Sequence, residues 1–180
     1  MMHYLKQAAF FLIPGVLLFA TTSAHAADAA CKPVFDAMMK MAATPNHQYL
    51  TETAAYSKGS TNGEIITTPT AMYIKAAGSW HSDAYNPQQQ VTELRQAYAA
   101  KPMTCKYLRD ESAGGEAAAM YDTRETQDDG TVVISQLWIS KSHGLPVKQT
   151  IDMDVGGKNG KSHNELRIDY ANVQPPAGVK

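Results

Sequence analysis

The sequence lacks an excess of charge of either sign, because 16 lysines and arginines stand against 17 aspartates and glutamates in 180 residues. No basic segment stands out, which excludes the electrostatic pattern of a nucleic-acid-binding domain. Internal repeats and long linkers are also missing, so we expect the chain beyond its first segment to form one domain.

Long apolar runs are confined to the first 26 residues. Lys6 provides a short cationic start, residues 8–20 are mostly apolar, and small residues at Ala24 and Ala26 end the segment. This order is typical of a secretory signal peptide. The run is shorter than the roughly 20 residues that a membrane-spanning helix needs, which argues against a retained anchor. We therefore expect cleavage near Ala26, a periplasmic location, and a mature domain over residues 27–180 that does not span the membrane.

Cysteine is scarce, and its two occurrences are Cys31 and Cys105. They do not form a Cys-X-X-Cys arrangement, which argues against a redox-active or metal-binding pair. In an oxidising compartment we expect them to form a structural disulfide. Lipid attachment at Cys31 is the alternative, but it conflicts with Asp28, because an apolar residue normally occupies that position before a lipid-modified cysteine.

Motifs of known catalytic chemistry are missing as well. The sequence has no Gly-X-Ser-X-Gly motif, and its histidines lack the spacing of helical metal ligands. Gly160-Lys161-Ser162 is similar to the end of a phosphate-binding loop, but Val155 stands where that loop requires its first glycine. We therefore interpret residues 156–160 as a hairpin turn. We predict no enzyme activity, no metal and no cofactor.

Two polar clusters leave alternatives open. His81 and Asp83 lie near Trp80 and are the most site-like group for a hydrolase or a metal enzyme. An exposed polar loop is the simpler interpretation of the same residues. Asp152 and Asp154 share one strand face and could hold a cation, although a solvated face is the expected role.

The hydrophobic pattern predicts an α+β fold with two helices and about eight antiparallel strands. Pro33 suits the first turn of a helix that Pro45 ends, and Asn86-Pro87 begins a second helix that ends before Pro102. Apolar alternation and short apolar runs predict strands at residues 47–56, 64–68, 71–76, 103–109, 117–126, 131–140, 147–155 and 165–170.

The best local match to a known family lies in the second half of the chain. It consists of Leu137-Trp138-Ile139-Ser140, the turn at residues 143–146, the strand from Val147, and Tyr170-Ala171-Asn172-Val173 ahead of Pro175-Pro176. With the order of signal, helix, strands, second helix and consecutive strands, the chain resembles the lipoprotein-localisation-factor (LolA/LolB-like) superfamily. The resemblance implies a curved antiparallel sheet, a half-barrel, with both helices on its concave side. In the best-known members the cavity between helices and sheet holds acyl chains.

Met38, Met39 and Met41 cluster on the first predicted helix. Methionine is unbranched and adaptable, so it suits a surface that accepts variable apolar ligands, although the same residues could fill a core under the sheet. We expect an apolar ligand or acyl chain in a cavity lined by Val34, Phe35, Met38, Tyr49, Leu137, Ile139, Ile151 and Met153. The choice depends on strand register, because a slip of one residue inverts the face.

The leading hypothesis is a periplasmic, non-enzymatic binding protein for an apolar or lipid-like ligand, acting in lipoprotein or lipid handling. The alternative is a structural or interaction protein of the envelope, with a filled core, no ligand, and other envelope proteins as partners. A cavity between the first helix and the sheet would favour the leading hypothesis.

Overall fold

The computed structural model describes residues 29–54, 59–100, 103–127, 129–154 and 160–179. The predicted signal peptide and most of the predicted turn at residues 156–160 lie outside this part of the chain. Among the described residues, no helix has both the length and the apolar character that crossing a membrane requires.

Two helices and nine strands make up the fold of the described residues. A short 3-10 turn, Ala29–Cys31, leads into helix α1, Lys32–Ala42, and helix α2 spans Pro87–Ala100. The strands are β1 (Asn46–Ala54), β2 (Ser60–Thr67), β3 (Ala71–Ala76), β4 (Ser79–Ala84), β5 (Met103–Ala113), β6 (Glu116–Thr126), β7 (Val132–Ser140), β8 (Pro146–Asp154) and β9 (Lys161–Asp169). They form one antiparallel sheet in the order β4-β3-β2-β1-β9-β8-β7-β6-β5.

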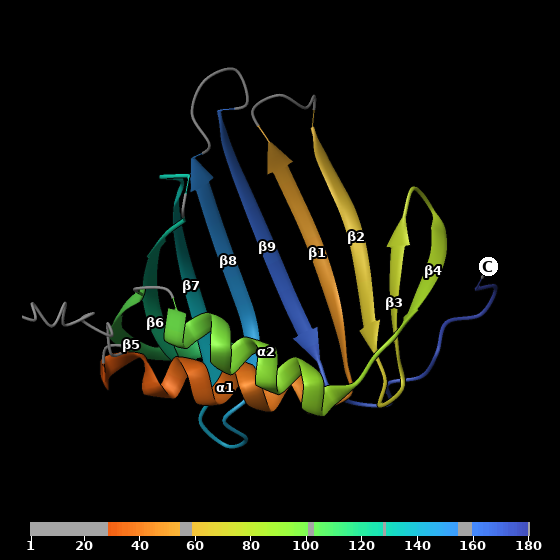
Figure 1. The fold of residues 1–180 in the computed structure, drawn as a ribbon, viewed down its shortest axis with the longest axis horizontal. Helices are drawn as coiled ribbons and strands as arrows, with labels where there is room; N and C mark the ends of the chain where they lie inside the picture. The colour runs from red at the N-terminus through yellow and green to blue at the C-terminus, as the bar shows by residue number, and fades with distance from the viewer. Residues whose placement is uncertain (1–28, 55–58, 101–102, 128, 155–159, 180) are drawn as a thin grey trace, which may run out of the picture.

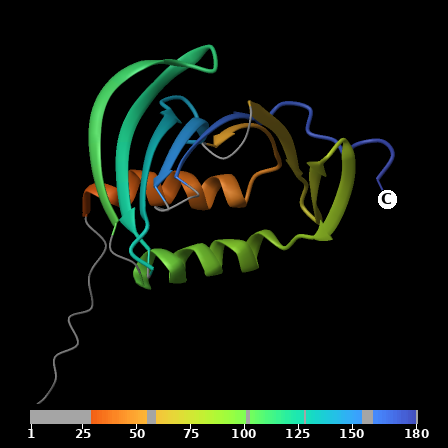
Figure 2. The ribbon, with the colours of Figure 1, turned by 90° about the horizontal axis from the view of Figure 1, so that it is seen from above.

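The sheet is strongly curved, and both helices lie on its concave side (Figure 1 and Figure 2). Helix α1 lies next to the sheet, and α2 lies over α1 on the side away from the sheet (Figure 2). Strands β4 and β5 are the two ends of the sheet and do not pair with each other, so the sheet stays open. The predicted α+β half-barrel is confirmed, with one strand more than the sequence predicted.

The additional strand is β4. The sequence predicts that the extended region ends near Trp80, but the chain turns back and continues to Ala84. Ala77 and Gly78 make this tight turn with φ angles of 49° and 81°, which is the left-handed geometry that two-residue hairpins favour. Its last four residues are exposed, so the strand carries little of the apolar alternation on which the prediction relied.

Helix α1 is apolar over much of its surface, and Val34, Phe35 and Ala37 are buried. A proline in its first turn costs no hydrogen bond there. At the other end, the buried Asn46 side chain donates from Nδ2 to the carbonyl oxygens of Met41, at 3.3 Å, and Thr44, at 2.8 Å. These bonds satisfy a carbonyl group that the helix end leaves free, and they join α1 directly to β1.

Helix α2 begins as the sequence predicts. Asn86 accepts hydrogen bonds at Oδ1 from the backbone N–H groups of Gln88, at 3.0 Å, and Gln89, at 3.1 Å. Tyr85 donates its hydroxyl proton to the carbonyl oxygen of Ala42 at 2.7 Å, which links the start of α2 to the end of α1. None of the residues of α2 is fully buried, and Tyr98 is the α2 residue that packs against the buried cluster around Phe35.

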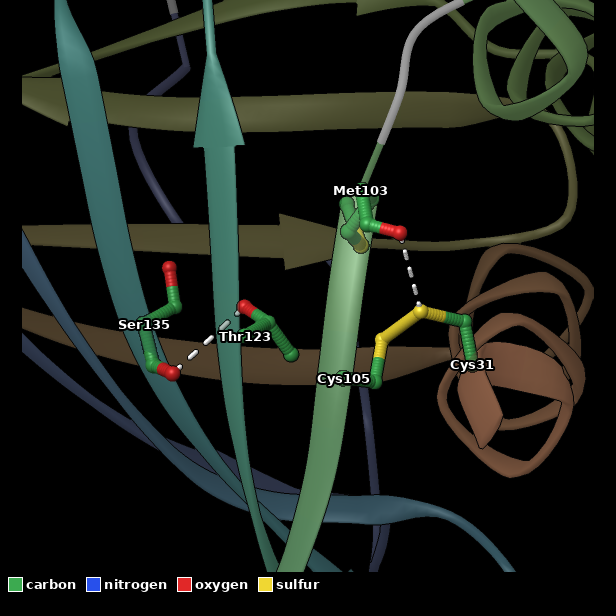
Figure 3. The surroundings of a disulfide bond; sticks show 5 residues. All are labelled: Cys31, Met103, Cys105, Thr123 and Ser135. Atoms are coloured by element: carbon green, nitrogen blue, oxygen red, sulfur yellow. Dashed lines mark hydrogen bonds between the residues drawn. A yellow bond between two sulfur atoms is a disulfide. The ribbon is translucent and has the colours of Figure 1, made fainter. Parts of the chain in front are cut away.

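The predicted disulfide is confirmed. Cys31 and Cys105 join the start of α1 to β5 across 74 residues of sequence (Figure 3). Both cysteines are buried, and Sγ of Cys31 also lies 3.5 Å from the carbonyl oxygen of Met103. The bond therefore fixes one end of α1 to a strand at the edge of the sheet.

Replacing both cysteines with serine is expected to lower the free energy of unfolding by about 2–4 kcal/mol, because the bond restricts the unfolded chain. Urea unfolding followed by circular dichroism measures the change. The wild-type chain in reductant should unfold like the double variant. A double variant as stable as the oxidised wild type would contradict the expectation.

Candidate functional site

A cavity of about 220 Å³ lies between the helices and the concave face of the sheet. Helix α1 contributes two residues to its lining, α2 contributes one, and strands β5 to β8 contribute the others. Seven of the eleven lining residues are apolar or aromatic. The lining consists of Val34, Met38, Tyr98, Met103, Thr123, Glu125, Val133, Ser135, Leu137, Gln149 and Ile151.

Alternation along β7 separates the cavity from the convex face of the sheet. Ser135 and Leu137 line the cavity, whereas Trp138 points the opposite way. The Trp138 indole N–H donates to Glu111, and Nζ of Lys148 lies 5.2 Å from the Trp138 ring centroid. On this face Trp138 is buried with Met120 and Val147 in a second apolar cluster, and the charged groups of Glu111 and Lys148 lie beside it.

The cavity borders the main buried core. Val34 and Leu137 line the cavity and also belong to a cluster that includes the disulfide and Phe35. Leu137 is only 2% exposed, which makes it one of the most buried large side chains of the protein. Because this cluster packs α1 against β7, the wall of the cavity is built on rigid elements.

Tyr98 brings α2 to the cavity. Its ring stacks on Phe35 of α1, with the ring centroids 4.3 Å apart and the planes inclined by 23°. Burial raises the pKa of Tyr98 to about 12, and the negative charge of Glu125 adds to this effect. The phenol therefore stays uncharged at neutral pH and closes the cavity with an aromatic face.

Polar groups are interspersed in the sheet wall. Thr123 and Ser135 are cross-strand partners, and the Thr123 hydroxyl donates to the Ser135 carbonyl oxygen at 3.4 Å (Figure 3). Glu125 accepts a hydrogen bond at 2.8 Å from the Gln127 side chain, and Gln149 provides an amide. The lining can hold an apolar body by contact and a polar end by hydrogen bonds.

Four of the eight cavity residues that the sequence predicts line the cavity: Val34, Met38, Leu137 and Ile151. Phe35 and Ile139 lie in the adjoining buried cluster. Met153 stands opposite Val133 in the register of β8 and β7, near the end of the wall.

Tyr49, unlike the other predicted residues outside the lining, lies on the opposite face of the sheet. It lies on the convex face, where Cζ of Arg167 is 4.1 Å from its ring centroid and the His47 ring stacks on it at 4.1 Å. Its neighbour Leu50 pairs with Leu166, which pairs in turn with Gln149 of the cavity wall. Apolar character suggested an inward position, but the strand register places Tyr49 outward.

Seven lining residues are absent from the sequence-based selection. Tyr98 carried a usable signal, because it shares a helical face with Val91 and Leu94. Polar residues in a cavity wall carry no such signal, since a threonine or glutamine on a strand is equally compatible with a solvated face. These residues are Tyr98, Met103, Thr123, Glu125, Val133, Ser135 and Gln149.

The alternative polar clusters lie elsewhere. His81 and Asp83 are exposed on the edge strand β4. In the second cluster, Oδ1 of Asp152 lies 2.7 Å from Nδ1 of His163, and this contact is an ion pair when the histidine is protonated. Asp154 lies 4.0 Å from Nζ of Lys161. In the part of the chain that the structure describes, no group of three or more His, Cys, Asp or Glu residues could hold a metal ion.

A comparison with protein-family models finds no match to this sequence, and a comparison with curated protein sequences finds no significant match. Among solved structures, LprF from Mycobacterium bovis is 13% identical over 81% of this chain and 96% of its own, with a TM-score of 0.43. MucB, solved in complex with MucA(peri), is 13% identical over 82% of this chain, with a TM-score of 0.49. This chain spans 60% of the MucB chain.

A LolA superfamily protein from Nitrosomonas europaea is also similar, at 10% identity over 74% of this chain and 90% of its own, with a TM-score of 0.20. The superfamily that the sequence resembles is thus represented among the similar structures. Identities this low concern the fold alone, so function has to be argued from the cavity itself.

Replacing Leu137 with alanine is expected to lower the free energy of unfolding by about 2–5 kcal/mol, because a buried side chain is removed from the cavity wall. Ile134→Ala is the matched control on the convex face of the same strand, and it should cost roughly 0.5 kcal/mol or less. Urea unfolding measures both. Equal losses in the two variants would show that the two faces of β7 are not packed as described.

The stability of the fold should fall at alkaline pH because of Tyr98. The unfolded chain releases the phenolic proton near its ordinary pKa, roughly 10, whereas the folded chain retains it up to about 12. The stabilisation from this group is present below the unfolded pKa and is lost as pH rises between these two values. Tyr98→Phe should therefore lose less stability across this window, and ultraviolet titration of tyrosinate should lose a late step at a pH of about 12. Removal of an early step instead would contradict the assignment.

Proposed function

We propose that this chain is a non-enzymatic binding protein for an apolar or lipid-like ligand. It is exported by cleavage of residues 1–26 and acts in the periplasm as a single domain over residues 27–180. The observation that carries the proposal is the cavity between α1, α2 and the concave sheet face, lined mainly by apolar side chains. The position of this space, between the first helix and the sheet, supports the proposal over a filled core.

The side chains of the cavity suit a ligand of variable shape. Met38 on α1 and Met103 on β5 both line the space, and unbranched methionine side chains adapt to different apolar partners. Gln149, Thr123 and Ser135 offer hydrogen-bonding groups within the same wall. An alkyl chain with a polar end, such as an acyl chain, matches this combination.

The size of the cavity limits what it can hold without movement. Its volume of about 220 Å³ is below the roughly 300–1,000 Å³ of typical small-molecule sites. A long acyl chain therefore requires α2 to move away from α1. None of the described residues of this helix is fully buried, and its displacement would separate Tyr98 from Phe35.

Binding of a fluorescent fatty acid, cis-parinaric acid, tests the proposal directly. Val133→Phe fills the cavity from β7 and should weaken binding at least about tenfold, which corresponds to roughly 1.4 kcal/mol. Ile134→Phe adds the same ring on the convex face and should leave the affinity unchanged. Circular dichroism confirms that both variants are folded.

Mass spectrometry of gently purified protein provides a second measurement, and a co-purified lipid is the expected result. If the wild-type chain neither binds the probe nor carries a lipid, the proposal fails, and a structural or interaction role in the envelope takes its place. Equal loss of probe binding in both phenylalanine variants would move the ligand away from this cavity.

A further inference from the structure

A second cavity, of about 420 Å³, lies at the ends of strands β6 to β9, near the turn that projects below α1 in Figure 1. Its volume lies within the range of small-molecule sites, roughly 300–1,000 Å³. Gly114 in the β5–β6 turn makes room for it: its φ is +62°, and an added Cβ would stand 3.4 Å from the Val147 side chain. This cavity shares none of its lining residues with the first.

Glu116 provides the charge of this cavity. Its Oε2 accepts hydrogen bonds from the hydroxyl of Ser140, which is 2% exposed, and from the hydroxyl of Ser142 at 2.9 Å. The Ser140 bond is the main cause that lowers the pKa of Glu116 below its ordinary value, so the carboxylate is ionised at neutral pH. Both partners are neutral, and no lysine, arginine or histidine within the described residues forms an ion pair with Glu116.

The remaining wall is apolar and aromatic. Leu145, Val147 and Ile168 line it and are buried. Tyr170 is held in place by the hydrogen bond that its hydroxyl donates to the carbonyl oxygen of Pro146 at 2.6 Å. Tyr170 and Glu116 line the same cavity, and both burial and the charge of Glu116 raise the pKa of Tyr170.

The charged side chains of Arg167 and Asp169 at the rim of this cavity pair with each other. Nη1 of Arg167 lies 2.8 Å from Asp169, and its guanidinium also stacks on Tyr49 outside the cavity. His143 is exposed, and its electrostatic effect on Glu116 lowers the pKa of that carboxyl, as the hydrogen bonds from Ser140 and Ser142 do. Lys40 of α1 donates to the His143 carbonyl oxygen from outside the lining. Glu116 thus remains the one carboxylate of the lining without an ionic partner among the described residues.

We propose that this second cavity binds an alkylammonium group, with the ammonium beside Glu116 and the apolar stem against Leu145, Val147 and Ile168. A carboxylate next to an aromatic ring is a favourable environment for an organic cation. The same chemistry occurs in a free amine and in a lysine side chain of a peptide. The site is independent of the apolar ligand proposed for the first cavity.

Titration of the mature protein with n-butylammonium and with the neutral n-butanol, followed by amide chemical shifts, tests the proposal. Butylammonium should bind at least about tenfold more tightly than butanol, with shifts centred on Glu116 and Tyr170. Equal binding of the two probes would overturn it. This comparison uses only the wild-type chain, so it decides the question even if a variant fails to fold.

Glu116→Gln should weaken butylammonium binding about tenfold or more, because it keeps the shape and removes the charge. Glu165→Gln removes an exposed carboxylate of the convex face and should leave the affinity unchanged. If Glu116→Gln binds like the wild type, the assignment of the site is wrong. Nα-acetyl-lysine methylamide separates the two sources: binding at least as tight as that of butylammonium supports a peptide lysine, and binding tenfold weaker supports a free amine.

Discussion

Helix α1 is held at both ends to strands that lie far apart in the sheet. The disulfide joins its first residues to β5, at one edge, and Asn46 joins its last residues to β1, beyond β6 to β9. Between these two points the helix buries Val34 and Phe35 against the concave face. The position of α2 and the first cavity both depend on this packing, because α2 reaches the cavity through the Phe35–Tyr98 contact and Val34 lines it.

The two faces of the sheet carry different chemistry. On the convex face, Glu64 lies 2.7 Å from Lys75 and 3.0 Å from His47, and the Lys75 hydrogen bond is the main cause that lowers the pKa of Glu64. Such half-exposed ion pairs contribute little stability each, but they keep this face soluble. On the concave face, burial of apolar side chains provides the main stabilisation. The first cavity lies between the helices and the concave face, and the second lies beside the ionised carboxylate of Glu116.

Sequence reasoning located the elements of the fold better than the lining of the site. The prolines and Asn86 marked the helix limits, and the alternation along β8 placed Ile151 on the cavity side. It failed at β4, because an exposed edge strand needs no apolar pattern. It also failed to locate the second cavity, since Glu116 and Tyr170 lie more than fifty residues apart and meet only at the end of the folded sheet.

The sequence by itself determined the α+β class, the helix limits and the pairing of the only two cysteines, because these depend on local propensities and on composition. The tertiary structure decided which face of each strand points toward α1. Tyr49 and Leu137 are both large apolar-bodied residues on predicted strands, yet only Leu137 reaches the cavity. The physical reason is that a strand has two equivalent faces, and only pairing with its neighbours and the packing of α1 distinguish the inner from the outer one.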